Sequence, residues 1–158
     1  SFEDAKNNVD LYVTHEGPCG TCSSLQDLSV YMEYGALLSD ESAECGFRGR
    51  LVSLVDAIKC FKDIGFTEAC YTTWAYTTKR TSDQCFDVCG PFVLQDLPPN
   101  GKSPECELHE CIQCDEEKSG PLFEVFAGRT RRNSGLLSDI VRPCSDLVEL
   151  EHKNPCDP

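Results

Sequence analysis

Twelve cysteines in a chain of 158 residues are the feature that most constrains what this sequence can fold into. An even number allows complete pairing into six disulfides, each worth about 2–4 kcal/mol through its restriction of the unfolded chain. Such bridges persist only in oxidising compartments. We therefore expect an extracellular or cell-surface protein in which every cysteine is structural: Cys19, Cys22, Cys45, Cys60, Cys70, Cys85, Cys89, Cys106, Cys111, Cys114, Cys144 and Cys156.

The alternative is a reduced protein whose cysteines bind metal ions. Its best candidate is the run formed by Cys106, His109, Cys111 and Cys114, whose side chains suit tetrahedral zinc although the spacing matches no familiar zinc motif. Three thiolates used in this way would leave nine cysteines, an odd number in a secreted chain. We therefore expect disulfides at these positions, and we predict no metal site and no cofactor.

Charge and hydropathy exclude several classes of protein. The net charge of −13 opposes binding to nucleic acid and to anionic membranes, because both are bound by neutralising phosphates with lysine and arginine. No apolar run approaches the roughly 20 residues of a membrane span. A chain that begins at Ser1 and lacks such a run is expected to be secreted with its signal peptide removed, although an arbitrary boundary would explain the first residue equally well.

The spacing of apolar residues predicts an all-α protein, a small disulfide-rich helical domain with long connections. Gly65 is a good helix stop, and Ser103 before Pro104 is a strong helix start. We expect helices over 24–45, 51–64, 67–76 and 103–119, a helical turn over 85–89, and short pieces over 121–127 and 135–141. Residues 1–18 are predicted to form an arm and 19–158 the domain, with a sub-lobe boundary near 96–102.

The Cys19-Gly20-Thr21-Cys22 motif is the candidate for redox chemistry. A helix N-terminus stabilises the first thiolate of such a pair, as in thiol–disulfide oxidoreductases. No βαβ pattern surrounds the motif, and ten other cysteines are present. We therefore interpret Cys19 and Cys22 as structural and keep a redox pair as the alternative.

Arg129, Arg131 and Arg132 form the densest positive patch in this acidic chain. Guanidinium groups bind sulfate, phosphate or carboxylate, so this patch is a candidate contact for a neighbouring molecule, a glycan or another anionic group. The alternative is ion pairing inside the same protein. The predicted arm carries Phe2, Leu11 and Val13, which are the anchors with which it would dock on a neighbouring subunit.

Several runs together resemble an uncharacterised family of cysteine-rich secreted proteins of unicellular algae and related protists. They are Cys19-Gly-Thr-Cys-Ser-Ser, Gly65-Phe-Thr-Glu-Ala-Cys, Asp115-Glu-Glu-Lys-Ser-Gly-Pro-Leu-Phe and Ala127-Gly-Arg-Thr-Arg-Arg-Asn-Ser-Gly. The resemblance covers most of the chain. It implies an extracellular or cell-surface setting and a role for the arginine-rich run, and it transfers no catalytic residue.

Three functions are compatible with these patterns. The first is a secreted, non-catalytic structural protein whose partner is itself, in a filament or surface layer, because contacts that do not close generate filaments. The second is a thiol–disulfide oxidoreductase that uses Cys19 and Cys22. The third is a secreted module that binds a carbohydrate or another ligand through Trp74 and the nearby Tyr71 and Tyr76.

Overall fold

The computed structural model describes residues 7–8, 12–95, 97, 107–136, 140 and 150. These residues form seven α-helices and no strand, which confirms the predicted all-α class. No helix among them is long and apolar enough to cross a membrane. The helices are α2 (Leu25–Tyr34), α3 (Leu38–Leu51), α4 (Leu54–Ile64), α5 (Glu68–Gln84), α6 (Phe86–Leu94), α7 (Glu110–Lys118) and α8 (Gly120–Ala127).

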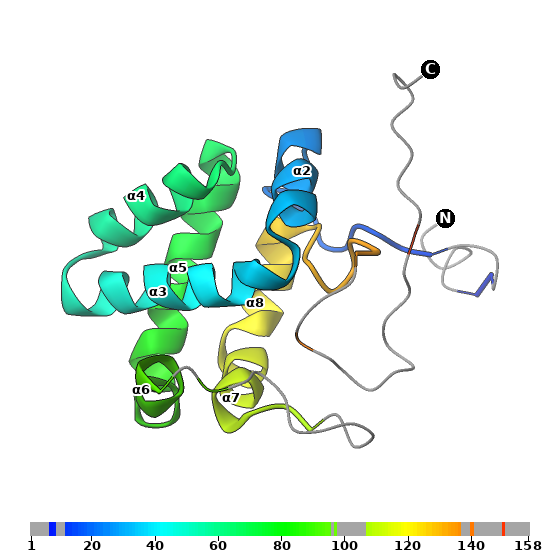
Figure 1. Ribbon diagram of the computed structural model, residues 1–158. Helices are drawn as coiled ribbons and strands as arrows, with labels where there is room; N and C mark the ends of the chain where they lie inside the picture. The colour runs from blue at the N-terminus through cyan, green and yellow to red at the C-terminus, as the bar shows by residue number, and fades with distance from the viewer. Residues whose placement is uncertain are drawn as a thin grey trace.

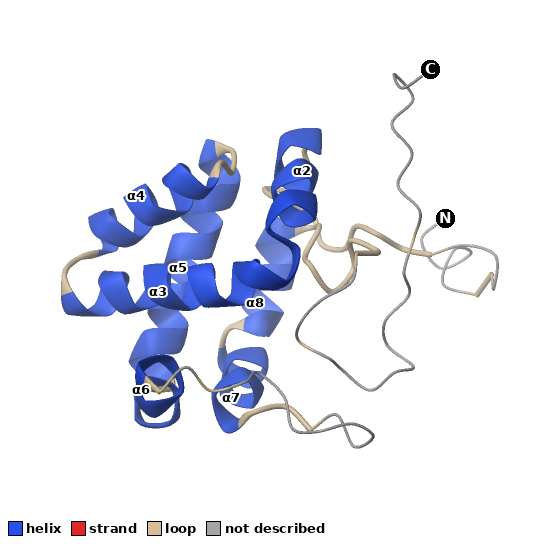
Figure 2. Cartoon of the chain, viewed as in Figure 1, coloured by secondary structure: helices blue, strands red, loops and turns tan. Residues whose placement is uncertain are grey.

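Helices α3, α4 and α5 pack against one another, and α3 crosses in front of α5 in Figure 1. Helices α6 and α7 lie side by side at the lower end of that group, and α8 runs from α7 towards α2. Figure 2 shows that α3, α4 and α5 are joined by short loops. The connection from α6 to α7 lies mostly outside the described residues, as does the predicted boundary near 96–102.

Local sequence explains where the first helices begin and end. The Ser24 side chain caps α2, the Ser53 side chain caps α4, and Gly65 ends α4 in a left-handed conformation at φ 112°. The helix expected over 24–45 is divided, because the chain turns at Gly35 (φ 47°) through a short 3-10 segment before α3 begins. Helix α3 then continues to Leu51, where the second predicted helix was expected to start.

Two further boundaries differ from the predicted ones. Helix α6 continues through Gly90 and Pro91 instead of ending at Cys89, and the Pro91 carbonyl still accepts a hydrogen bond from the backbone N–H of Gln95 at 3.0 Å. Helix α7 begins at Glu110, later than the expected start at Ser103, because the His109 side chain caps it by accepting from the Cys111 N–H at 3.1 Å.

The main hydrophobic core lies between α2, α3, α4, α5 and α8. The Trp74 ring is its centre, with ring centroids 4.6 Å from Phe123, 5.7 Å from Phe61 and 6.0 Å from Phe66. Tyr31 is 1% exposed, and this burial raises the pKa of its phenol far above the usual value. A second, smaller cluster is formed by α6 and α7 around Phe92, Cys111 and Ile112.

Disulfides fasten neighbouring helices together, as the sequence predicted. Two bridges join α6, including its N-cap residue Cys85, to α7; one joins α3 to α4, and one joins the segment before α2 to α5. The pairs are Cys85–Cys114, Cys89–Cys111, Cys45–Cys60 and Cys22–Cys70.

The remaining cysteines divide into two cases. Cys19 is exposed and is bonded to no other cysteine within the described residues, so its expected role in a bridge is not found there. Cys106, Cys144 and Cys156 lie outside the described residues.

Gly49 of α3 lies close to α4, since a Cβ atom at this position would lie 2.9 Å from the Cβ of Ala57. We expect Gly49→Ala to lower the free energy of unfolding by about 1–2 kcal/mol, because overpacking outweighs the gain in helix propensity. Ala57→Gly removes the opposing methyl group. A double-mutant cycle followed by urea denaturation should show a favourable coupling of about 1 kcal/mol. Strict additivity would contradict this close contact.

Candidate functional site

The segment of residues 16–23, which we call the cap segment, closes the C-terminal end of α8. Its backbone N–H groups donate to the last two carbonyl groups of that helix and to the carbonyl of its C-cap residue, each at 2.9 Å: Thr21 to Phe126, Cys22 to Ala127, and Glu16 to Gly128. Such carbonyls have no partner within their own helix. Gly128 has φ 72°, and a Cβ atom there would lie 2.5 Å from the His15 ring. The contact therefore requires glycine at this position.

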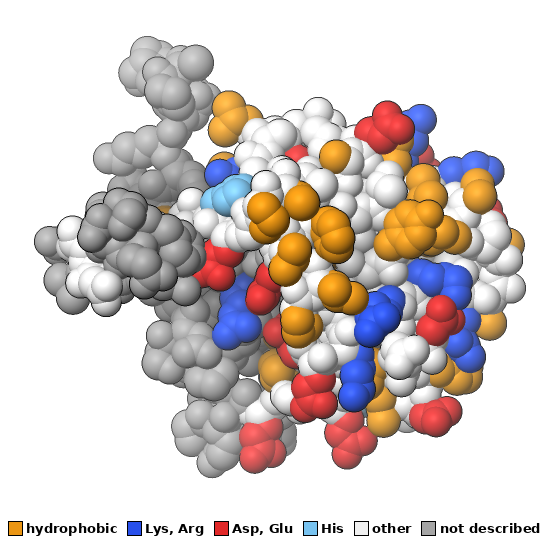
Figure 3. All heavy atoms as spheres, turned by 180° about the vertical axis from the view of Figure 1, so that it is seen from behind, with side chains coloured by type: hydrophobic (Ala, Val, Ile, Leu, Met, Phe, Trp, Pro, Cys, Tyr) orange, Lys and Arg blue, Asp and Glu red, His pale blue; other side chains and the backbone are white. Residues whose placement is uncertain are grey.

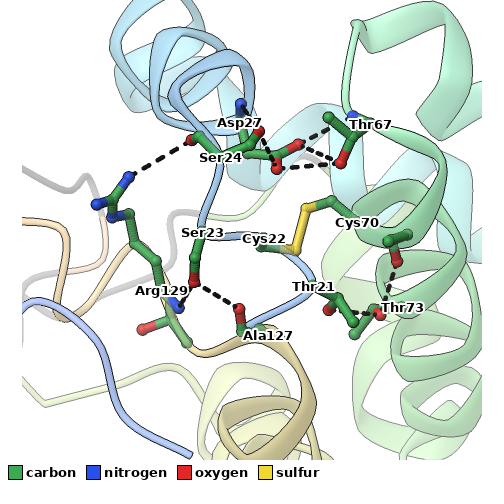
Figure 4. The surroundings of a disulfide bond; sticks show 12 residues. Thr21, Cys22, Ser23, Ser24, Asp27, Thr67, Cys70, Thr73, Ala127 and Arg129 are labelled. Carbon is green, nitrogen blue, oxygen red and sulfur yellow. Dashed lines mark hydrogen bonds between the residues drawn. A yellow bond between two sulfur atoms is a disulfide. The ribbon is translucent and has the colours of Figure 1, made fainter. Parts of the chain in front are cut away.

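The same segment is bonded to the first turn of α5 (Figure 4). Cys22 and Cys70 are both fully buried, and their disulfide joins positions 48 residues apart in the chain. Beside it, the buried Asp27 carboxylate of α2 accepts hydrogen bonds from the backbone N–H of Thr67 at 2.9 Å and from its hydroxyl at 3.0 Å. Because Thr67 is the N-cap of α5, Asp27 connects the N-terminal ends of two helices.

The disulfide decides between the two interpretations of the Cys19-Gly20-Thr21-Cys22 motif in this structure. A redox pair requires Cys19 and Cys22 to bond to each other, whereas Cys22 is bonded to Cys70 and has no exposed surface. The flanking Thr21 hydroxyl donates to the Phe126 carbonyl at 2.9 Å. Cys22 is therefore part of a structural junction. The Cys19–Cys22 disulfide that the oxidoreductase alternative requires is not formed.

Three of the four residues in the zinc alternative have other partners in this structure. Cys111 and Cys114 are bonded to Cys89 and Cys85, so their sulfur atoms are not thiolates. The His109 ring is used as a helix cap.

The three arginines of the loop 129–132, which we call the Arg loop, contact their own chain. The Arg131 guanidinium donates to the Gly35 carbonyl at 2.7 Å, and Arg129 reaches the Ser24 carbonyl at 3.5 Å. The Arg132 guanidinium lies 3.8 Å from the carboxylates of both Glu116 and Glu124. These contacts favour the interpretation of internal pairing.

The described part of the predicted arm also contacts its own chain. The Tyr12 hydroxyl donates to the Arg132 carbonyl at 3.4 Å, and Val13 is half-buried. Val13 is therefore partly covered without a neighbouring subunit. The other two proposed anchors, Phe2 and Leu11, lie outside the described residues.

A cavity of about 180 Å³ lies between the main core and the smaller α6–α7 cluster. We call it the interhelical cavity. An engineered cavity of about 150 Å³ with apolar walls binds benzene, so a space of this size accepts one ring. Its walls come from α3, α5, α6, α7, α8 and the Arg loop, and its largest apolar side chains are Phe47, Trp74, Phe86, Phe92, Ile112 and Phe123.

Among the aromatic wall residues, only Trp74 was singled out from the sequence, while Arg131 and Arg132, predicted as contacts for anionic groups, also line the cavity. Of the three aromatic residues proposed to hold a ligand, Trp74 lines the cavity, Tyr71 packs against the main core, and Tyr76 is 59% exposed. The other walls come from helices far apart in the chain. The only local signal was the apolar run of α6, which continues past the expected end of that helix at Cys89.

Asp27 and Asp56 allow a matched test of the junction. Each lies three residues after a serine N-cap and donates its backbone N–H to that serine, but only Asp27 reaches a second helix. We expect Asp27→Asn to lower the free energy of unfolding by about 2–3 kcal/mol, since a buried acceptor network loses one oxygen. Asp56→Asn should cost about 0.5–1 kcal/mol. Equal losses in urea denaturation would show that the connection to α5 is unimportant.

Comparison with known proteins places the chain in a family. A family model described as a family of unknown function, DUF8771, matches residues 55–150, which include α5 to α8 and both disulfides between α6 and α7. No curated protein and no solved structure matches the chain. Because the match covers more than half of the sequence, the chain belongs to this family of unknown function.

Proposed function

We propose that this protein is an extracellular, non-catalytic binding module that holds a small amphipathic ligand in the interhelical cavity. The observation that carries the proposal is the position of this cavity. It lies where two separate hydrophobic clusters meet, with aromatic side chains from both clusters and charged side chains in one wall. Ligand sites in proteins have this composition of mostly apolar walls and a few convergent polar groups.

Covalent bonds support a preformed site. Cys89–Cys111 and Cys85–Cys114 hold together α6 and α7, which form one side of the cavity, and Cys45–Cys60 fixes α3 to α4 on the other side. A cavity whose walls are already held in place costs less conformational entropy when a ligand binds.

The same disulfides support an extracellular location. Four bridges are typical of proteins in oxidising compartments. The net charge of −13 is compatible with a protein that stays dispersed in such a compartment and favours cationic over anionic partners.

Trp74 is the only tryptophan in the chain and lines the cavity, so its fluorescence reports on occupancy. We expect 2-phenylethanol, an uncharged probe with one ring, to change this fluorescence in a saturable way. Val93→Phe places a ring into the cavity from α6 and should weaken binding at least tenfold. Val55→Phe, the same change at an exposed position of α4, should leave the affinity unchanged.

Calorimetry provides an independent reading of the same titration. Equal affinities for the two variants would place the probe outside the interhelical cavity. The absence of any saturable signal from the unmodified protein would refute the proposed function.

Self-assembly as a structural protein, the leading expectation from the sequence, becomes the second proposal, and one specific observation favours it. The side chains of Leu122, Val125 and Phe126 on α8 are each more than 40% exposed. Figure 3 shows the molecule from behind, where apolar side chains gather between charged ones. Since the arginines of the Arg loop contact their own chain, such an assembly would use α8 in place of that loop. Exposed apolar patches of this kind mark association surfaces.

Assembly is tested by sedimentation velocity over a hundredfold range of concentration. We expect the unmodified protein to form larger species and Leu122→Ser to suppress them. Leu94→Ser is the matched control, because Leu94 is also exposed but lies on α6. A strictly monomeric protein at the highest concentration would exclude this second function.

A further inference from the structure

We infer that the Arg loop is a site for an endoprotease that recognises clustered arginines, and that the fold keeps this site closed. Cleavage hydrolyses the peptide bond between Arg132 and Asn133: water adds across the bond and leaves a carboxylate on Arg132 and a new amino terminus on Asn133. Chains whose loop is open are cut and folded chains are not, so processing distinguishes the two. This role rests on the extracellular location proposed above and is independent of any ligand in the interhelical cavity.

The residues before this bond have the pattern that such proteases recognise. Arg129, Arg131 and Arg132 occupy the fourth, second and first positions before it. Secretory endoproteases of the subtilisin type bind arginines at these positions with carboxylates, because a guanidinium pairs with a carboxylate through two parallel hydrogen bonds. No other two arginines in the sequence are three positions apart. The sequence therefore offers a single site of this kind.

The loop lies at the surface, but its backbone is not freely accessible. Arg132 is exposed, whereas Thr130 is 6% and Ser134 is 0% exposed. The Arg132 carbonyl, which has to enter the oxyanion hole of the protease, accepts a hydrogen bond from the Tyr12 hydroxyl at 3.4 Å. An endoprotease extends the chain on both sides of the bond, and susceptibility follows the burial and hydrogen bonding of that backbone. A protease can therefore reach Arg132 but cannot extend the chain unless Thr130 and Ser134 move.

Asn133, directly after the Arg loop, holds the chain in a closed turn. Its side-chain oxygen accepts from the Thr130 backbone N–H at 2.6 Å and from the Thr130 hydroxyl at 3.1 Å, and its side-chain nitrogen donates to the Gly128 carbonyl at 3.1 Å. The Ser134 hydroxyl donates to the Arg131 carbonyl at 2.9 Å. These bonds join residues three to five positions apart, so they break when the chain is extended.

Two of the arginines connect the loop to remote segments. The Arg131 guanidinium donates to the Gly35 carbonyl at 2.7 Å, and the Arg129 backbone N–H donates to the Ser23 hydroxyl at 3.2 Å (Figure 4). These partners lie 96 and 106 positions away in the chain. Ser23 belongs to the cap segment, which a buried disulfide fastens to α5. Because both contacts form only when remote segments have come together, the closed loop is a property of the folded chain.

Two states of the full-length chain test the site. The oxidised protein and the reduced, alkylated protein are incubated with a subtilisin-like processing endoprotease that requires arginine at the first and fourth positions, and mass spectrometry identifies the products. We expect the alkylated chain to be cut after Arg132 and the oxidised protein to be cut about a hundredfold more slowly, since a closed loop is rarely open. In the alkylated chain, Arg129→Gln should slow cleavage about tenfold, because one recognised guanidinium is lost.

Asn133→Ala removes the side chain that closes the turn and keeps all three arginines. Loss of a hydrogen-bond acceptor shifts the opening equilibrium about tenfold, so the folded variant should be cut about tenfold faster than the unmodified protein. Ser53→Ala is the matched control: it removes a side-chain hydrogen bond to the Asp56 backbone N–H at the start of α4, and it should leave the rate unchanged.

Each rate is divided by the rate for the same variant after reduction and alkylation, which removes any effect of the substitution on recognition by the protease. Circular dichroism shows that both variants are folded under the assay conditions. If the alkylated chain is not cut after Arg132, the loop is not a processing site. If the oxidised protein is cut as fast as the alkylated chain, the fold does not close the site. If Ser53→Ala accelerates cleavage as much as Asn133→Ala does, cleavage follows global unfolding and the role of Asn133 is wrong.

Discussion

The disulfide between Cys22 and Cys70, with the Asp27 carboxylate beside it, is the junction on which the rest of the structure depends. It joins the cap segment to the first turn of α5, and the cap segment in turn satisfies the last carbonyls of α8. Three elements far apart in the chain therefore meet at one buried point. A bridge that closes a loop of 48 residues removes more entropy from the unfolded chain than a short one does.

This junction also explains how a cavity persists in a small domain. The junction positions α8 against α5, so Phe123 contacts Trp74, and these two residues form the part of the cavity wall that belongs to the main core. The opposite wall is a second cluster held by its own two disulfides. Two units that are each fixed separately do not collapse completely onto each other, because protein interiors relax only partly around a void.

Much of the helical architecture was predictable because its signals are local. Serine caps at positions 24 and 53 and the glycine stop at 65 act within one turn of a helix. The wrong helix boundary at α6 arises where a local signal is overridden. Pro91 is a helix breaker by propensity, yet α6 continues through it while Cys89, two residues earlier, is bonded to α7. Tertiary bonds of this kind override a local preference.

The sequence by itself determined the all-α class and the use of cysteines to fasten helices, because periodicity, capping and composition depend only on near neighbours. Only the tertiary structure decided which cysteines pair, and hence that Cys22 belongs to a structural junction with Cys70 and not to a redox pair with Cys19. The interhelical cavity likewise exists only in the tertiary structure, because its walls come from five helices. The physical reason is that pairing and cavities depend on distances between segments remote in the chain, and residue spacing does not encode those distances.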